Sequence, residues 1–167
     1  MSSEVMPEQK SWTDTPPLNP PIRHVIAEFV ESQTWLDKLG EPIQNWLLAF
    51  FGEPGQPTRK LKDILNGTWL GHSVHPLLTD VPLGSWSGTM LLDLAWLNQE
   101  SKGMADGADL TLLLGLLGAT GSVVTGVADW SDQIGADRRV GLMHGLLNGT
   151  ISITYLASLI LGRLGQR

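Results

Sequence analysis

The sequence predicts an all-α membrane protein in which three transmembrane helices follow a region of short amphipathic helices. The prediction rests on three long apolar windows, at about residues 77–97, 110–128 and 140–161. Each window is close to the ~20 residues that an α-helix needs to cross the hydrocarbon core of a bilayer. A soluble bundle of buried helices is the alternative, but such helices are usually shorter and carry a polar face.

The chain divides into four parts by composition. Residues 1–19 are polar and rich in proline, lack the basic and apolar segments of a signal peptide, and are expected to form a disordered or extended arm. Residues 20–65 are expected to form an amphipathic helical region, and residues 66–163 the three-span membrane domain. Residues 164–167 remain as a short tail.

The amphipathic region shows apolar residues at helical spacing in two segments, 20-PPIRHVIAEFVESQ-33 and 42-PIQNWLLAFF-51. A third short helix is expected at about 58–65 and should end at Asn66-Gly67. All three are too short to span a bilayer. Amphipathic helices of this kind lie on a membrane surface or pack against a partner.

The three windows differ in their polar content. The first contains two carboxylates, Asp80 and Asp93, together with Pro82, whereas the second contains no charged residue. The third contains His144 and Tyr155 as its only ionisable groups. Lysine and arginine are more frequent before the first window and between the second and third than on the opposite side. Since positive residues favour the cytoplasmic side, we expect a cytoplasmic N-terminus.

The composition excludes several classes of function. A net charge of −6 argues against a nucleic-acid partner, which requires clustered basic residues. The absence of cysteine excludes disulfides, thiolate-bound iron–sulfur clusters and covalently attached haem in this chain. No zinc-protease or nucleophile-elbow motif is present, so we expect no catalytic activity of its own.

Polar residues gather at one side of the predicted membrane domain. The start of the first span, the end of the second and the start of the third lie on the same side of the membrane. These three segments are remote in sequence but converge there. The residues concerned are His72, His75, Asp80, Asp129, Trp130, Arg138, His144 and Asn148, while Asp93 lies nearer the opposite side. His144 and Asn148 are four residues apart and therefore share one helix face.

This polar layer suggests a cofactor site. A b-type haem needs two axial ligands from facing segments, and His75 and His144 are the candidate pair. A divalent metal is the alternative, since imidazole and carboxylate groups are common ligands. Its candidate ligands are His72, His75, Asp80, Asp129 and His144. The predicted function is an integral membrane module that supports electron transfer through such a cofactor.

Other interpretations of the same residues remain open. The polar layer could be purely structural, with hydrogen bonds at helix starts and Trp130 as an interfacial anchor. Small residues at four-residue spacing in each window permit close helix packing in lipid. They favour a cofactor-free accessory subunit that contacts a membrane or redox protein or forms a homo-oligomer. Asp80 and Asp93 also raise the possibility of a small proton- or ion-linked transporter.

Four motifs in the chain resemble those of a known family. They are 66-NGTWLGHSVHPLLTDVPLGSW-86, Asp93, 125-TGVADW-130 and 138-RRVGLMHGLLN-148. In order and spacing they resemble a family of uncharacterised bacterial membrane domains, domain of unknown function 2231, over about residues 20–163. The resemblance implies a location in the bacterial inner membrane.

The resemblance also bears on the candidate residues. Members often have a Gly-His-Pro-Leu-His-Pro motif; here Ser73-Val74 replaces the first Pro-Leu, and both histidines and Pro76 match. A Rieske-type iron–sulfur domain follows this domain in some members, which implies an association with electron transfer, here through a separate partner. The positions carried over are His72, His75, Asp80, Asp93, Asp129, Trp130, Arg138, His144 and Asn148.

Overall fold

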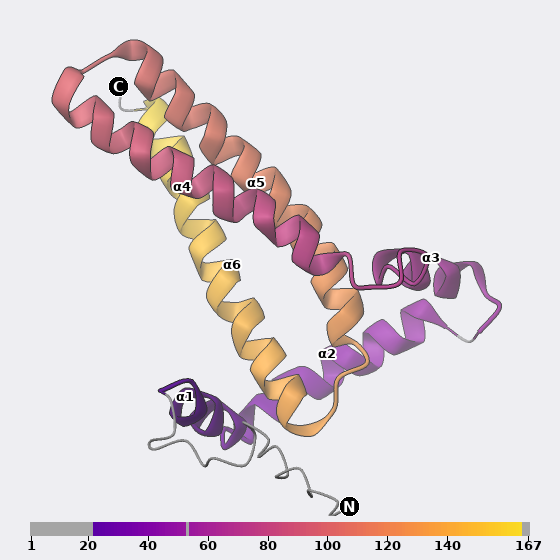
Figure 1. The fold of residues 1–167 in the computed structure, drawn as a ribbon. Coiled ribbons are helices and arrows are strands. Elements are labelled where there is room, and N and C mark those ends of the chain that lie inside the picture. Colours follow the sequence, from indigo (N-terminus) through magenta and orange to yellow (C-terminus); the bar gives the residue numbers. More distant parts are fainter. Residues whose placement is uncertain (1–21, 53, 165–167) are drawn as a thin grey trace, which may run out of the picture.

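The computed structural model describes residues 22–52 and 54–164, which form helices and connecting loops without any strand (Figure 1). The helices are α1 (Ile22–Glu31), α2 (Trp35–Phe51), α3 (Pro57–Leu65), α4 (His75–Gln99), α5 (Lys102–Trp130) and α6 (Gly135–Leu164). The prediction of an all-helical fold is confirmed for these residues. The expected arm at 1–19, and residues 165–167 of the tail, lie outside the described residues.

The two helices α4 and α5 form a long antiparallel hairpin (Figure 1). Glu100 adopts a left-handed conformation (φ 47°) at the turn between them. Glycines of α5 allow the close approach of α4. A Cβ atom at Gly115 would lie 2.2 Å from Nε1 of Trp86, and one at Gly118 would lie 2.6 Å from Cγ1 of Val81. Such small residues at helix contacts are typical of packing in lipid.

Helix α6 packs against this hairpin at separate points. The rings of Trp86 on α4 and Tyr155 on α6 have centroids 4.5 Å apart, and Leu159 is buried. Large apolar side chains elsewhere on α6 are exposed; Ile153, for example, is 70% exposed. Much of the surface of α6 is therefore open to lipid or to another chain.

Helix α2 runs across the end of the bundle where α5 ends and α6 begins (Figure 1). Its buried stripe consists of Leu36, Gly40, Gln44, Leu47 and Phe51. Leu47 and Phe51 form a small core with Ala128 and Trp130 of α5. We expected this helix from Pro42 onward, but it begins at Trp35 and continues through Pro42. The buried stripe extends along the whole helix, so its tertiary contacts favour a continuous helix despite the proline.

Two helices are long and apolar enough to cross a membrane, at Lys102–Trp130 and Gly135–Gly162. They contain the second and third predicted windows. The first window lies in α4, which does not reach the same apolar character, so the prediction of three transmembrane helices is not confirmed. The reason lies in the sequence of α4, which contains Asp80, Asp93 and Pro82 among its apolar residues.

Candidate functional site

The loop before α4 is tied to the end of α5 by a serine and a carboxylate. The hydroxyl of Ser73 donates a hydrogen bond to the carboxylate of Asp129, and the backbone N–H of His75 donates to the same serine oxygen at 3.3 Å. Ser73 therefore connects the start of α4 to α5. The sequence comparison had marked Ser73 only as a departure from the family motif, so this role was missed.

His75 is held in one orientation by the backbone of α5. Its Nδ1 lies 2.8 Å from the carbonyl oxygen of Ser122, and Thr125 Oγ1 lies 3.5 Å from the same nitrogen. A carbonyl can only accept, so Nδ1 carries the proton in this bond. In the neutral ring the lone pair is then on Nε2. Gly126 provides the space for the ring, because a Cβ there would lie 2.7 Å from Cε1 of His75.

The second candidate ligand lies beside the first. The rings of His75 and His144 have centroids 6.3 Å apart and an interplanar angle of 83°. The amide nitrogen of Asn148 donates to the carbonyl oxygen of His144 at 2.9 Å, and it lies 3.3 Å from each ring nitrogen. His75 lies at the start of α4 and His144 in the first half of α6, so the fold brings together two residues that are remote in sequence.

The other candidate metal ligands do not gather around this pair. His72 is exposed, and its Nδ1 lies 3.0 Å from the backbone oxygen of Ser73. Asp80 is exposed on α4, and the carboxylate of Asp129 accepts the hydrogen bond from Ser73. Within 22–52 and 54–164, no group of three or more His, Cys, Asp or Glu side chains is placed to hold a metal ion. The predicted five-residue metal set is therefore not assembled.

Arg138 and Trp130 connect helices at the end of the bundle. Arg138 forms ion pairs with Asp37 and Glu41 of α2, each at 2.8 Å, and Trp130 Nε1 donates to the backbone oxygen of Arg138 at 2.9 Å. Arg139 also pairs with Asp37, at 2.7 Å. The neighbouring guanidinium groups of Arg139 and Arg138 lower the pKa of Asp37 to about 2. These contacts fasten α2 to α6.

Two further polar contacts at this end were missed in the sequence. The amide nitrogen of Gln44 donates to the backbone oxygens of Trp130, Ser131 and Gln133. Lys62 is fully buried, and its ammonium lies 2.5 Å from a carboxylate oxygen of Asp132. Lys62 had been counted only as a positive charge near the membrane, because its partner lies 70 residues away.

Comparisons with known proteins agree with a membrane location. A family model described as "Predicted membrane protein (DUF2231)" matches residues 71–167, more than half of the chain. The matched region begins just before His72 and includes α4, α5 and α6. No match was found among curated proteins or among solved structures.

Proposed function

The chain belongs to the DUF2231 family of predicted membrane proteins, and on that premise we propose that it is an electron-transfer module holding a b-type haem between His75 and His144. The observation that carries the proposal is the approach of the two imidazoles, at 6.3 Å between ring centroids. We place the module in the bacterial inner membrane with a cytoplasmic N-terminus.

The proposal includes a third membrane span formed by α4. Helices α4 and α5 are of similar length and pack along each other as an antiparallel hairpin (Figure 1). If α5 crosses the bilayer, α4 has to cross it as well, because the two helices pack along each other. The carboxylates of α4 can be tolerated there, because Asp80 is near the start of the helix and Asp93 lines a pocket between helices.

The ring separation suits ligation of one metal by two imidazoles. A metal–imidazole bond is about 2 Å long, which puts each ring centroid about 3 Å from the metal and two opposite centroids about 6 Å apart. The Nδ1 of His75 donates to a backbone carbonyl, as metal-bound histidines commonly do, and Nε2 keeps the lone pair. Two imidazoles are too few for a typical zinc site, whereas haem supplies its remaining ligands from the macrocycle.

The surface beside His144 is open next to two glycines. The side chain of His144 is exposed, and a Cβ placed at Gly145 or Gly149 would have nothing within 4 Å. If His75 and His144 both held a haem, the group would supply one-electron transfer there, so we expect a separate redox protein or a second copy of the chain as the partner.

The proposal is tested by purifying the protein from cells supplied with haem and measuring bound haem by absorption. We expect that His75→Ala and His144→Ala lose the haem signal, while His72→Ala keeps it. His72 is the matched control, because it is an exposed histidine three residues from His75 that does not contact the pair. Equal haem content in all four proteins would contradict the assignment of the ligands.

The second candidate function is a cofactor-free accessory subunit. The contacts of His75 favour it, because the hydrogen bond to the carbonyl oxygen of Ser122 and the packing of the ring against Gly126 would also be expected of a purely structural histidine. This candidate predicts a stable complex in mild detergent. The protein would then purify without haem, together with a stoichiometric partner or as a homo-oligomer, as shown by mass spectrometry of the intact complex.

A further inference from the structure

Helix α2 carries an exposed apolar stripe beside the stripe that it buries. The exposed stripe consists of Trp35, Leu39, Ile43, Trp46 and Phe50, which are 48–65% exposed. Each of these residues directly precedes a member of the buried stripe, so the exposed stripe is turned from it by about 100° around the helix. The apolar part of α2 is therefore wider than its contact with the bundle.

The opposite side of α2 carries polar residues. Lys38, Glu41 and Asn45 are exposed there, facing away from the midpoint of the two stripes. A helix with an apolar half and a polar half is typical of the boundary between lipid head groups and acyl chains. Part of the apolar half of α2 docks on the bundle, and the exposed stripe is left for another contact.

The place of α2 in the fold indicates what that contact is. The amide nitrogen of Gln44 donates hydrogen bonds to the backbone oxygens of Trp130, Ser131 and Gln133, where α5 ends and the connection to α6 begins. Helices α5 and α6 are both long and apolar enough to cross a membrane. A connection between two spans lies at the membrane surface, because its backbone groups need hydrogen-bond partners that the hydrocarbon core lacks. Helix α2 therefore lies at the level of the membrane surface, with its exposed stripe beside the lipids that surround the bundle.

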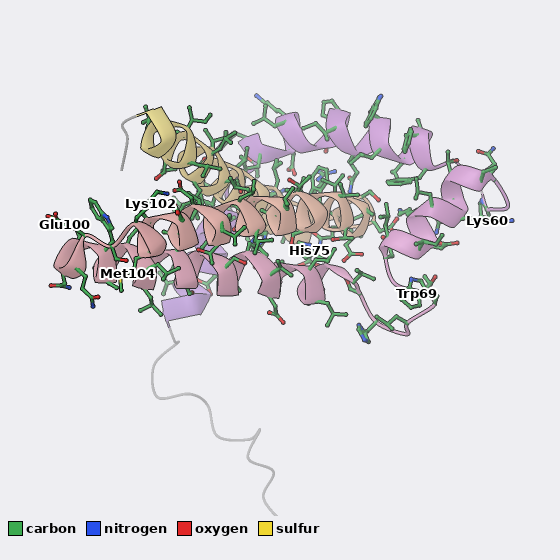
Figure 2. The ribbon with its side chains drawn as sticks, turned by 90° about the horizontal axis from the view of Figure 1, so that it is seen from above. Lys60, Trp69, His75, Glu100, Lys102 and Met104 are labelled. Carbon is green, nitrogen blue, oxygen red and sulfur yellow. The ribbon has the colours of Figure 1, made fainter. Side chains whose placement is uncertain are left out.

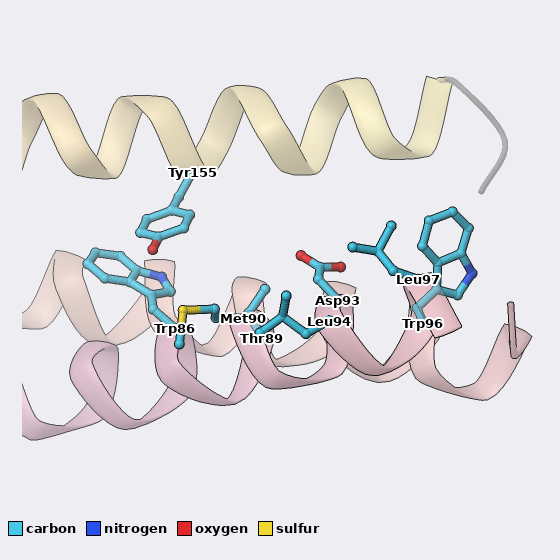
Figure 3. Close-up of a pocket in the computed structure, with 8 residues that line it drawn as sticks. All are labelled: Trp86, Thr89, Met90, Asp93, Leu94, Trp96, Leu97 and Tyr155. Carbon is cyan, nitrogen blue, oxygen red and sulfur yellow. The ribbon is translucent and has the colours of Figure 1, made fainter. Parts of the chain in front are cut away.

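Tryptophans lie at both ends of the hairpin. Trp69, in the loop before α4, is 67% exposed, and Figure 2 shows it at the opposite end of the molecule from Lys102. Trp96 lies near the other end of α4 (Figure 3). From His75 to Trp96 the helix rises by about 32 Å, close to the ~30 Å thickness of the hydrocarbon core. Tryptophan is enriched at both membrane interfaces, so the two tryptophans of the exposed stripe fit the interface at the α2 end.

We propose that α2 lies lengthwise in the interfacial layer of the bilayer, with its exposed stripe in contact with lipid acyl chains. Lys38, Glu41 and Asn45 then face water. A soluble protein partner would approach from the water, where it would meet this polar side and not the stripe. The contact goes beyond the proposed electron transfer and does not depend on a bound haem.

The test uses single cysteines in the full chain, which has no cysteine of its own. Leu39→Cys and Ile43→Cys place a nitroxide label on the exposed stripe. Asn45→Cys is the matched control, because Asn45 is exposed on the polar side of the same helix. Each protein is reconstituted in phosphatidylcholine vesicles. Electron paramagnetic resonance then measures how often the label collides with oxygen, which concentrates among acyl chains, and with a neutral nickel chelate, which stays in water.

We expect the ratio of oxygen to nickel collisions to be several-fold higher at positions 39 and 43 than at position 45. Equal ratios at the three positions would place the stripe in water and overturn the proposal. Rare collisions with both reagents at 39 and 43 would also overturn it, because a protein partner or a second copy of the chain would then cover the stripe. Circular dichroism checks that each variant folds. If one does not, Trp46→Cys or Phe50→Cys takes its place, since both residues belong to the same stripe.

Discussion

Replacing Gly126 by alanine should disturb the histidine pair from the α5 side. The added Cβ would lie 2.7 Å from Cε1 and 2.9 Å from Nδ1 of His75, closer than side chains pack. The imidazole would have to turn away, and its hydrogen bond to the carbonyl oxygen of Ser122 would be strained or lost. Gly145→Ala is the matched control, because a Cβ there has nothing within 4 Å.

The expected size of the effect follows from two opposing terms. Overpacking of a well-filled contact costs about 1–3 kcal/mol. Alanine in place of glycine within a helix contributes up to ~1 kcal/mol in the other direction, and this gain is common to both variants. The free energy of unfolding of Gly126→Ala should therefore lie about 1–3 kcal/mol below that of Gly145→Ala. At about 2–4 °C per kcal/mol, the difference in Tm is about 2–12 °C.

Thermal unfolding in detergent, followed by circular dichroism, measures this difference. In a His75→Ala background the cost of Gly126→Ala should disappear, because the clashing ring is absent. The coupling between the two positions should thus account for nearly the whole penalty. Equal Tm values for Gly126→Ala and Gly145→Ala, or an unchanged penalty without His75, would refute the described packing of the ring.

Three further predictions concern the end of the bundle and the topology. Asp132→Asn should lower the free energy of unfolding by about 2 kcal/mol, because the buried ammonium of Lys62 loses its charged hydrogen-bond partner. Lys62→Met should restore stability in the double variant, and chemical unfolding tests both; no recovery would contradict a buried ion pair. The pKa of Asp37 is lowered from 3.8 to about 2, so its stabilising contribution is complete above about pH 4 and is lost as the pH falls through 2. Between about pH 5 and 2 the free energy of unfolding should therefore fall more steeply with pH in the wild type than in Asp37→Asn. Single cysteines at Lys60 and Lys102 should react with an impermeant maleimide from opposite sides of the membrane if α4 spans it, and reaction from the same side would show that α4 does not.

Helix content and the approach of the two histidines could be anticipated from the sequence. The apolar windows and the amphipathic spacing are properties of neighbouring residues, so they predict helices directly. An up–down–up order of helices puts the start of α4 and the first half of α6 at the same end. This order is why His75 and His144 are expected to lie near each other, and their ring centroids are 6.3 Å apart.

The partners of the charged residues could not be anticipated. Lys62 and Asp132 are 70 residues apart, and Arg138 and Asp37 are 101 residues apart. Their pairing depends on how α2 and α3 dock on the bundle, and no local spacing encodes it. In the sequence, Lys62 indicated only an orientation relative to the membrane, and Arg138 was placed in the polar layer without a partner from α2. In the structure they are bound to carboxylates and fasten the end of the bundle.

The boundaries of α2 and the membrane character of α4 could not be predicted from local sequence patterns either. The amphipathic segment in the sequence was expected from Pro42 to Phe51, but Leu36 and Gly40 are buried against the bundle and favour helix before the proline. The apolar window in α4 is weakened by Asp80 and by Asp93, so composition alone does not decide whether it spans. Its pairing with α5 is a tertiary property.

The absorption spectrum of the purified wild-type protein, recorded oxidised and reduced after expression with haem, tests the proposed function most directly. We predict a Soret band that shifts on reduction, with a haem content of about one per chain, as expected for a single pair of histidine ligands. A protein that is folded and membrane-inserted, yet shows no Soret band even after reconstitution with haemin, would contradict haem binding by His75 and His144.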